Sequence, residues 1–220
     1  MIIGQSVQQV QRRIATACER AGRSPGEVTL VAVTKTVDAA SIEAAFKAGI
    51  RHFGENRVQE AKPKIEQLAR LKAEVTWHMV GHLQTNKAKT ASAIFDIIHS
   101  VDSLRLAEML DSSAQKKLPI LIQVNVSAEE TKGGFGPAEV GDAVGRIAKL
   151  PNLRIEGLMT IAPWAAEPEQ ARPAFRRLRE LRDALGLTHL SMGMTDDFEV
   201  AIEEGATIVR IGRAIFGERA

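Results

Sequence analysis

Strand-like and helix-like segments alternate along the whole of this 220-residue chain. The strand-like runs are rich in β-branched residues and are expected at residues 28–34, 51–54, 75–80, 96–100, 119–126, 153–159, 188–191 and 207–211. Helical periodicity is expected between them at residues 40–48, 57–71, 85–93, 103–116, 139–149, 172–185 and 197–203. Strands that are joined by crossover helices form a parallel sheet, because each helix returns the chain to the end of the sheet where the next strand begins.

The number of strand–helix units indicates that this parallel sheet closes on itself. A doubly wound sheet rarely needs eight units in 220 residues, whereas a (β/α)8 barrel requires them. One more helix is expected before the first strand, because apolar residues recur every three or four positions from Val7 to Ala21 and Gly22 follows as a stop signal. The sequence therefore predicts an α/β fold: one TIM barrel domain over residues 1–220, with an extra N-terminal helix covering the bottom of the barrel.

Composition removes several classes of function. No run approaches about 18 apolar residues, which excludes a membrane-spanning helix, and the N-terminus lacks the basic and apolar regions of a secretory signal. The 29 basic and 27 acidic residues give a net charge of only +2, which argues against a nucleic-acid-binding protein or an RNA-binding scaffold. The single cysteine, Cys18, fits a reducing compartment, so a cytoplasmic location is expected. A monomer is expected because no long apolar stripe is left outside the core.

Two observations on side-chain types narrow the chemistry. The chain contains no tyrosine, so a mechanism that uses a phenol as acid or base is excluded. Of the five histidines, His78 and His82 are four residues apart, but they fall on a strand and a turn and belong to no His-Glu-x-x-His or Cys-x-x-Cys pattern. No metal site is predicted, and His82 is instead expected at the rim of a pocket or in a plain loop.

In a barrel of this kind the chemistry lies at the carboxyl ends of the strands. Lys35 follows a strand that reads as buried on both faces, so its amine is expected at the mouth of an apolar barrel. Desolvation would lower the pKa of such a lysine from about 10.4 and leave more free amine to attack a carbonyl group. The alternative is a strand-end lysine that extends its amine into solvent.

The last two strands are followed by loops suited to binding an anion. Residues 191–195 (SMGMT) lie between a strand and a helix, and residues 210–213 (RIGR) follow the eighth strand. Glycine in each loop permits close approach of the backbone to a ligand, and phosphate sites near strands seven and eight recur in barrels. Together with Lys35, these loops predict one ligand that carries both a carbonyl group and a phosphate.

The chain resembles the pyridoxal phosphate (PLP) homeostasis proteins, whose fold is similar to the barrel domain of alanine racemase. The resemblance covers almost the whole chain in order, and it is carried by residues 31–36 (VAVTKT), 53–60 (FGENRVQE), 77–87 (WHMVGHLQTNK), 123–126 (QVNV), 157–160 (GLMT), 191–197 (SMGMTDD) and 210–217 (RIGRAIFG). The departures from the family's pattern are small. Asp38 lies close to a point at which many relatives carry a proline, and Thr195 stands where serine is commoner but keeps the hydroxyl group.

The resemblance implies a cofactor site. Lys35 would form a Schiff base with PLP, and Arg210 would face the pyridine nitrogen. The residues implied to hold the phosphate are Ser191 and the backbone at Gly193, Gly212 and Arg213. Those implied to line the ring are Asn56 and Met159. The candidates for the rim of the pocket are His82, Thr160 and Thr195.

Binding of PLP does not by itself make the chain an enzyme. A strongly catalytic site places a carboxylate against the pyridine nitrogen to keep it protonated, and arginine cannot accept that proton. Alanine racemase, which the fold resembles, tolerates an arginine there but uses a lysine and a tyrosine as its two bases, and this chain has no tyrosine. The predicted function is a non-catalytic carrier or regulator of intracellular PLP, and through it of amino-acid metabolism, with no catalytic residue and with apo PLP-dependent enzymes as partners.

Two enzymatic alternatives remain open at this point. The first is a PLP-dependent racemase or lyase of a single-domain type, in which His82 or an ordered water replaces the tyrosine. The second is a Schiff-base aldolase that acts on a phosphorylated sugar without PLP. Visible absorbance of the purified protein separates both PLP functions from the aldolase, and turnover assays separate the carrier from the racemase or lyase.

Overall fold

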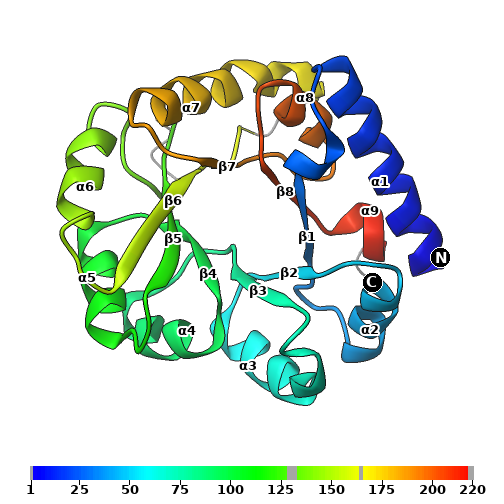
Figure 1. Ribbon diagram of the computed structural model, residues 1–220, viewed down its shortest axis with the longest axis horizontal. Helices are drawn as coiled ribbons and strands as arrows, with labels where there is room; N and C mark the ends of the chain where they lie inside the picture. The colour runs from blue at the N-terminus through cyan, green and yellow to red at the C-terminus, as the bar shows by residue number, and fades with distance from the viewer. Residues whose placement is uncertain (1, 128–132, 164–165, 218–220) are drawn as a thin grey trace.

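The computed structural model describes residues 2–127, 133–163 and 166–217, and its strands form a closed parallel barrel in chain order (Figure 1). Each strand overlaps one of the expected segments, which confirms the predicted TIM barrel. The strands are β1 (Thr29–Val33), β2 (His52–Glu55), β3 (Thr76–Met79), β4 (Ile97–Val101), β5 (Leu118–Gln123), β6 (Leu153–Met159), β7 (His189–Ser191) and β8 (Ile208–Ile211).

Helices surround the barrel, as Figure 1 shows. They are α1 (Ile3–Arg20), α2 (Ala39–Lys47), α3 (Val58–Gln67), α4 (Ala88–Ile94), α5 (Leu104–Ser113), α6 (Val140–Ile147), α7 (Arg172–Ala184), α8 (Phe198–Glu203) and α9 (Arg213–Phe216). The helix expected at 57–71 ends earlier, at Gln67, and a separate 3₁₀ turn, Ala69–Leu71, follows it. The helix expected at 85–93 begins with a 3₁₀ turn, Thr85–Lys87, and short helix α9 was not predicted. None of the described helices is both long enough and apolar enough to cross a bilayer.

The N-terminal helix is present, but it does not cover the bottom of the barrel as expected. Helix α1 lies in the outer ring beside α8, α9 and α2 (Figure 1). Its apolar stripe, which includes Val7 and Ile14, joins the cluster buried between strands and helices. On its other side Arg13 pairs with Glu199 of α8 at 2.9 Å and lies over the Phe198 ring. Because α8 has only six residues, α1 adds cover that α8 alone could not give to this side of the barrel.

Two separate apolar clusters hold the barrel together. The larger lies between the strands and the helices, and the smaller is made by Val31, Val80, Leu121, Met159 and Ile208. Side chains alternate between the two faces of a strand, so a residue two positions from a member of the smaller cluster also points into the barrel. Val33, two residues after Val31, also packs against this inner cluster, and Lys35 follows in the turn at the carboxyl end of β1.

The barrel interior also contains polar side chains. His78, His99, Ser191 and Arg210 are all buried, with exposed fractions of 4% or less. Arg210 is two positions after Ile208 and therefore points inward from β8. The inside of this barrel is thus apolar on one part of its wall and hydrogen-bonded on another, and the hydrogen-bonded part reaches the carboxyl ends of β7 and β8.

Candidate functional site

Lys35 lies in a strained turn at the carboxyl end of β1. Val37 N donates to Thr34 O at 3.0 Å, and Thr36, the third residue of this turn, has a φ of +64°. Thr36 is the one non-glycine residue with positive φ in the described part of the chain, and its Oγ1 donates to Lys35 O at 2.6 Å. Such a conformation costs on the order of 1–3 kcal/mol and is found at ligand sites more often than elsewhere. The turn fixes the backbone from which the half-buried Lys35 side chain extends.

A buried ion pair lies directly below this turn. Glu55, at the end of β2, is fully buried, and its Oε1 accepts hydrogen bonds from Thr34 Oγ1 and Lys64 Nζ, each at 2.6 Å. Lys64 Nζ also donates to the Thr34 carbonyl at 2.7 Å. Sequence reasoning missed Glu55 and Lys64, although Glu55 falls within the segment 53–60 that carries the family resemblance. Their contacts fix the position of Thr34, the residue before Lys35.

Three of the predicted residues meet around a buried cation. Arg210 donates to Ser191 Oγ at 2.6 Å and to the Thr160 carbonyl at 2.9 Å. Burial lowers the pKa of Arg210 to about 10, while the Asp197 carboxylate opposes this shift, so the guanidinium is charged at neutral pH. No carboxylate in the described ranges accepts a hydrogen bond from it. The arrangement is therefore a buried positive charge that an anion or a ring nitrogen can approach.

The loops after β7 and β8 are pressed against neighbouring backbone. Gly193 has a φ of +90°, and a Cβ added there would lie 2.6 Å from the Ala201 Cβ. A Cβ at Gly212 would lie 3.2 Å from the Val33 carbonyl oxygen, so this loop is beside the end of β1. Within the described residues, neither the Gly193 nor the Gly212 N–H donates to a protein acceptor. These two positions form a narrow cradle, in which Gly193 has no room for a side chain and Gly212 little, and it presents backbone donors.

The remaining predicted residues occupy different depths. Met159 is fully buried in the inner apolar cluster, and Asn56 is half-buried just after β2. Thr160 is buried rather than at a rim, and its Oγ1 donates to Val124 O at 2.8 Å. Thr195 is half-buried in the loop after β7, and the exposed Arg213 side chain forms an ion pair with Asp196.

His82 lies beside an open groove at the same end of the barrel. The groove, of about 550 Å³, is lined by residues that include Asn56 after β2 and Gly81 and His82 after β3. A Cβ at Gly81 would lie 2.4 Å from the Asn56 carbonyl oxygen, so the loops after β2 and β3 are in close contact. His82 Nδ1 is 3.1 Å from Asp102 Oδ2, and the imidazole is largely exposed. His82 therefore lies exposed beside this groove.

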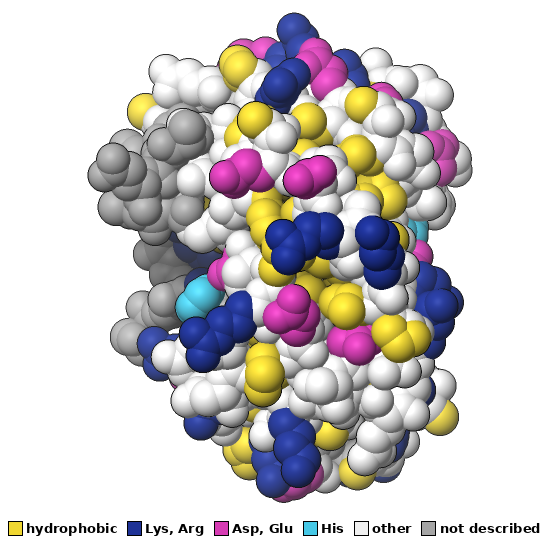
Figure 2. Space-filling model, turned by 90° about the vertical axis from the view of Figure 1, so that its left-hand side faces the viewer, with side chains coloured by type: hydrophobic (Ala, Val, Ile, Leu, Met, Phe, Trp, Pro, Cys, Tyr) yellow, Lys and Arg dark blue, Asp and Glu magenta, His cyan; other side chains and the backbone are white. Residues whose placement is uncertain are grey.

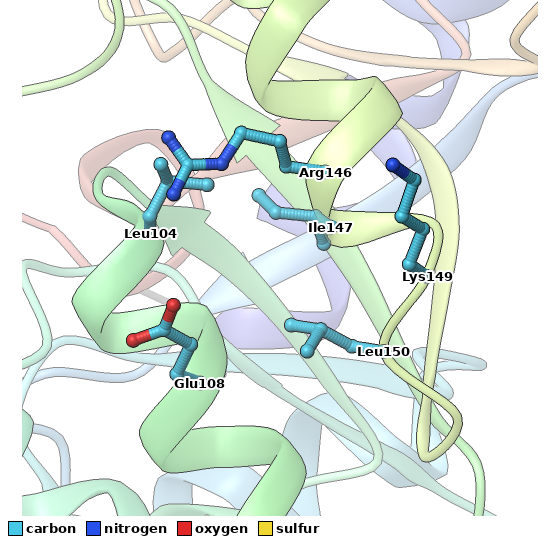
Figure 3. A pocket seen from close by; sticks show the side chains of 6 residues that line it. All are labelled: Leu104, Glu108, Arg146, Ile147, Lys149 and Leu150. Carbon is cyan, nitrogen blue, oxygen red and sulfur yellow. The ribbon is translucent and has the colours of Figure 1, made fainter.

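A smaller hollow of about 220 Å³ lies on the outer side of the barrel, away from these residues. It runs between α5 and α6, where Figure 2 shows apolar side chains among charged ones, and Figure 3 shows its lining: Leu104, Glu108, Arg146, Ile147, Lys149 and Leu150. None of the residues predicted for the site contributes to it. Among the described residues no group of three or more His, Cys, Asp or Glu side chains could hold a metal ion.

The buried histidines predict a loss of stability in acid. Burial, together with the neighbouring His52, lowers the pKa of His78 to about 3, whereas an unfolded chain titrates its histidines near 6.5. Between these values the unfolded state binds more protons, so the free energy of unfolding falls as the pH decreases below about 6.5. From pH 7 to pH 5 His78 alone is expected to remove about 2 kcal/mol.

Urea unfolding of the wild type and of His78→Leu at both pH values measures this effect. The variant is expected to show the weaker pH dependence, and the exposed His82→Asn is the control that should retain the dependence of the wild type. An equal pH dependence of the free energy of unfolding in the wild type and in His78→Leu would contradict the lowered pKa of His78 in the folded protein.

Comparison with known proteins agrees with this geometry. The family model "Alanine racemase, N-terminal domain" matches residues 6–220. The pyridoxal phosphate homeostasis protein of Aquifex aeolicus is 48% identical over 220 residues, covering 96% of each chain. That of Pseudomonas aeruginosa is 45% identical, covering 99% of this chain and 96% of its own.

Solved structures show the same relationship. A protein from Bifidobacterium adolescentis superposes with a TM-score of 0.92 at 42% identity, covering 97% of this chain and 94% of its own. PipY of Synechococcus elongatus, solved with PLP bound, has a TM-score of 0.82 at 39% identity, covering 94% of this chain and 100% of its own. Family model, identity and coverage agree, and the chain therefore belongs to the pyridoxal phosphate homeostasis protein family.

Proposed function

We propose that this protein binds PLP as a Schiff base on Lys35 and acts as a non-catalytic carrier or regulator of the intracellular PLP pool, and through it of amino-acid metabolism. The observation that carries the proposal is the buried Arg210–Ser191 pair at the same end of the barrel as Lys35. The register of the sheet supports it, because Arg210 pairs with Val31 of β1, the strand that leads to Lys35. The PLP-bound structure of the relative PipY supports the choice of ligand.

Each part of the cofactor has a counterpart among these residues. PLP supplies an aldehyde, and the Lys35 amine attacks its carbon, so that a C=N bond forms and water leaves. The groups that would hold the phosphate are the Ser191 hydroxyl and the backbone at Gly193, Gly212 and Arg213. Arg210 would donate to the pyridine nitrogen, and Asn56 and Met159 would line the ring.

The same residues argue for holding the cofactor rather than using it. Arg210 remains charged at neutral pH, so it can donate to the pyridine nitrogen but cannot supply the carboxylate that keeps this nitrogen protonated. The ring is then a weak electron acceptor. The chain also lacks the tyrosine that could act as a second base.

Reductive trapping tests the site and the ligand together. Purified protein incubated with PLP is expected to develop visible absorbance, and borohydride is expected to fix the cofactor on the peptide that contains Lys35. Label on another lysine, such as Lys64 or Lys87, would overturn the Lys35 assignment. Robust racemisation or decarboxylation of amino acids by the pure protein would overturn the non-catalytic role.

The His82–Asp102 pair is the observation that favours a second candidate, a single-domain PLP-dependent racemase or lyase. A carboxylate 3.1 Å from the imidazole would orient it as a base at the rim of the site. Turnover that is lost in His82→Ala, while PLP binding is retained, would support this candidate over the carrier.

We infer that the carrier is a cytoplasmic monomer and that it exchanges PLP with apo PLP-dependent enzymes. The buried, unpaired thiol of Cys18 suits a reducing compartment. Size-exclusion chromatography with light scattering should give the mass of one chain. Mixing the PLP-loaded protein with a PLP-dependent apo-enzyme should restore the activity of that enzyme. The rate of this recovery should exceed the rate at which PLP dissociates from the carrier, measured in a solution that traps free PLP.

A further inference from the structure

A line of hydrogen-bonded imidazoles runs through the barrel to the candidate site. His52 Nδ1 is 3.0 Å from His78 Nε2, and His78 Nδ1 is 2.8 Å from His99 Nε2. His99 Nδ1 is in turn 2.8 Å from Ser191 Oγ, the same atom that accepts from Arg210. We call His52, His78 and His99 the histidine line. It connects the amino end of β2 with the group that is proposed to hold the phosphate.

The register of the strands explains why these histidines meet. His78 pairs with Gly54, two positions beyond His52, and Ile97 pairs with His78, two positions before His99. Each step therefore moves to the next strand and one inward-facing position higher. Since β4 and β7 are not neighbours in the barrel, the last contact, from His99 to Ser191, crosses the interior.

The three imidazoles are neutral at pH 7. Burial lowers the pKa of His52 and His78, and that of His99 lies well below the usual value because of burial and the nearby His78 and Arg210. A neutral imidazole carries one N–H donor and one nitrogen acceptor. If His78 donates to His99 through Nδ1, then His99 must donate to Ser191 and His52 must donate to His78. All the bonds of the line therefore run in one direction or all run in the other.

The two directions differ at Ser191. When the line runs toward Ser191, its Oγ accepts from both His99 and Arg210, and the hydroxyl proton is directed to a third partner. When the line runs the other way, Ser191 gives its proton to His99. Ser191 is fully buried, and without a ligand His99 is the one acceptor for this proton in the described part of the chain. An anionic oxygen bound at the mouth of the barrel would supply the third partner.

We propose that the histidine line is a set of positioning residues that makes Ser191 a hydrogen-bond donor to a phosphate group, and that binding of the phosphate sets the tautomer of all three imidazoles. Without an anion, Ser191 donates to His99, and each imidazole of the line carries its proton on Nε2. With a phosphate at the site, each carries it on Nδ1. The proposal rests on the proposed function for the identity of the ligand.

Nitrogen NMR of the wild-type protein tests the proposal directly, because ¹⁵N shifts distinguish the Nδ1–H tautomer from the Nε2–H tautomer. Saturating PLP is expected to move His78 and His99 to the Nδ1–H form. Pyridoxal, which can form the same Schiff base but has no phosphate, is expected to leave them unchanged. His189, which contacts Thr207 Oγ1 outside the line, is the internal control. Unchanged tautomers of His78 and His99 in PLP-saturated protein would overturn the proposal.

A variant supplies a second, independent measurement. His99→Phe removes the N–H that would direct the Ser191 hydroxyl proton toward the phosphate. PLP binding is expected to weaken by up to about tenfold, as the Ser191–phosphate bond loses its fixed orientation, without a change in the affinity for pyridoxal. His189→Gln is the matched control, with both affinities unchanged. Equal losses for PLP and pyridoxal would indicate a merely structural role for His99 and overturn the proposal. If the wild-type protein binds no PLP, the proposed function is overturned, and the proposed role of the histidine line in binding the phosphate is overturned with it.

Discussion

Replacing Lys35 with alanine is expected to abolish covalent attachment of PLP and to weaken its total binding by at least about 100-fold, or about 2.7 kcal/mol. The imine is the one covalent contact proposed between protein and cofactor, and the remaining contacts are hydrogen bonds to phosphate and ring. Titration calorimetry measures the affinity, and loss of the visible band together with loss of the borohydride label measures the covalent part.

Two further variants separate the imine from charge and location. Lys35→Arg retains a cation but cannot form the bond, so it should lose the visible band as Lys35→Ala does. Lys87 borders the groove at the same end of the barrel and is half-buried like Lys35, so Lys87→Ala should bind PLP as the wild type does. A Lys35→Ala protein that retains the band and the label would show that another amine holds PLP.

Replacing Gly157 with alanine is expected to destabilise the protein by about 3 kcal/mol or more, because the new methyl group meets backbone rather than a movable side chain. A Cβ at Gly157 would lie 2.0 Å from the His189 carbonyl oxygen on the paired strand β7. Strands β6 and β7 would have to separate, which would also displace Ser191 at the end of β7.

Thermal unfolding measures this cost, and a decrease in Tm of about 6–12 °C is expected for a domain of this size. Gly145 is the matched control, because it lies within α6 and a Cβ there would meet nothing within 4 Å. Gly145→Ala should therefore leave Tm unchanged or raise it slightly, as alanine favours helix more than glycine does. A Gly157→Ala protein with the Tm of the wild type would contradict the close packing of β6 against β7.

Local sequence could predict the secondary-structure elements of this molecule and the residues at the ends of its strands. Strands such as β1, β4 and β8 are short, largely buried runs rich in β-branched residues, so their existence depends little on what lies beside them. Lys35 was recognisable because it is a cation at the end of such a run, whereas the role expected of Arg210 came from the family resemblance. That both residues lie toward the same end of the barrel follows from the parallel topology.

Contacts between elements were not predictable in the same way. Lys64 reaches Glu55 from within a helix whose sequence shows only ordinary charges, and no spacing rule relates the two residues. The position of α1 depends on how much wall the six-residue α8 leaves uncovered, which is a property of the assembled ring. His52, His78 and His99 lie on three different strands, and the register that aligns them is set by the whole barrel.

The alternation that separates the two apolar clusters has a consequence for how such a barrel can evolve. Outward positions such as Ala32 and Phe53 pack against helices and maintain the wall, whereas inward positions near the strand ends face the ligand. A substitution of an inward residue can alter which molecule is held while the seam between strands and helices stays intact. Descendants of one ancestral barrel can therefore diverge in chemistry, some gaining turnover and others only retention, without first passing through an unstable form.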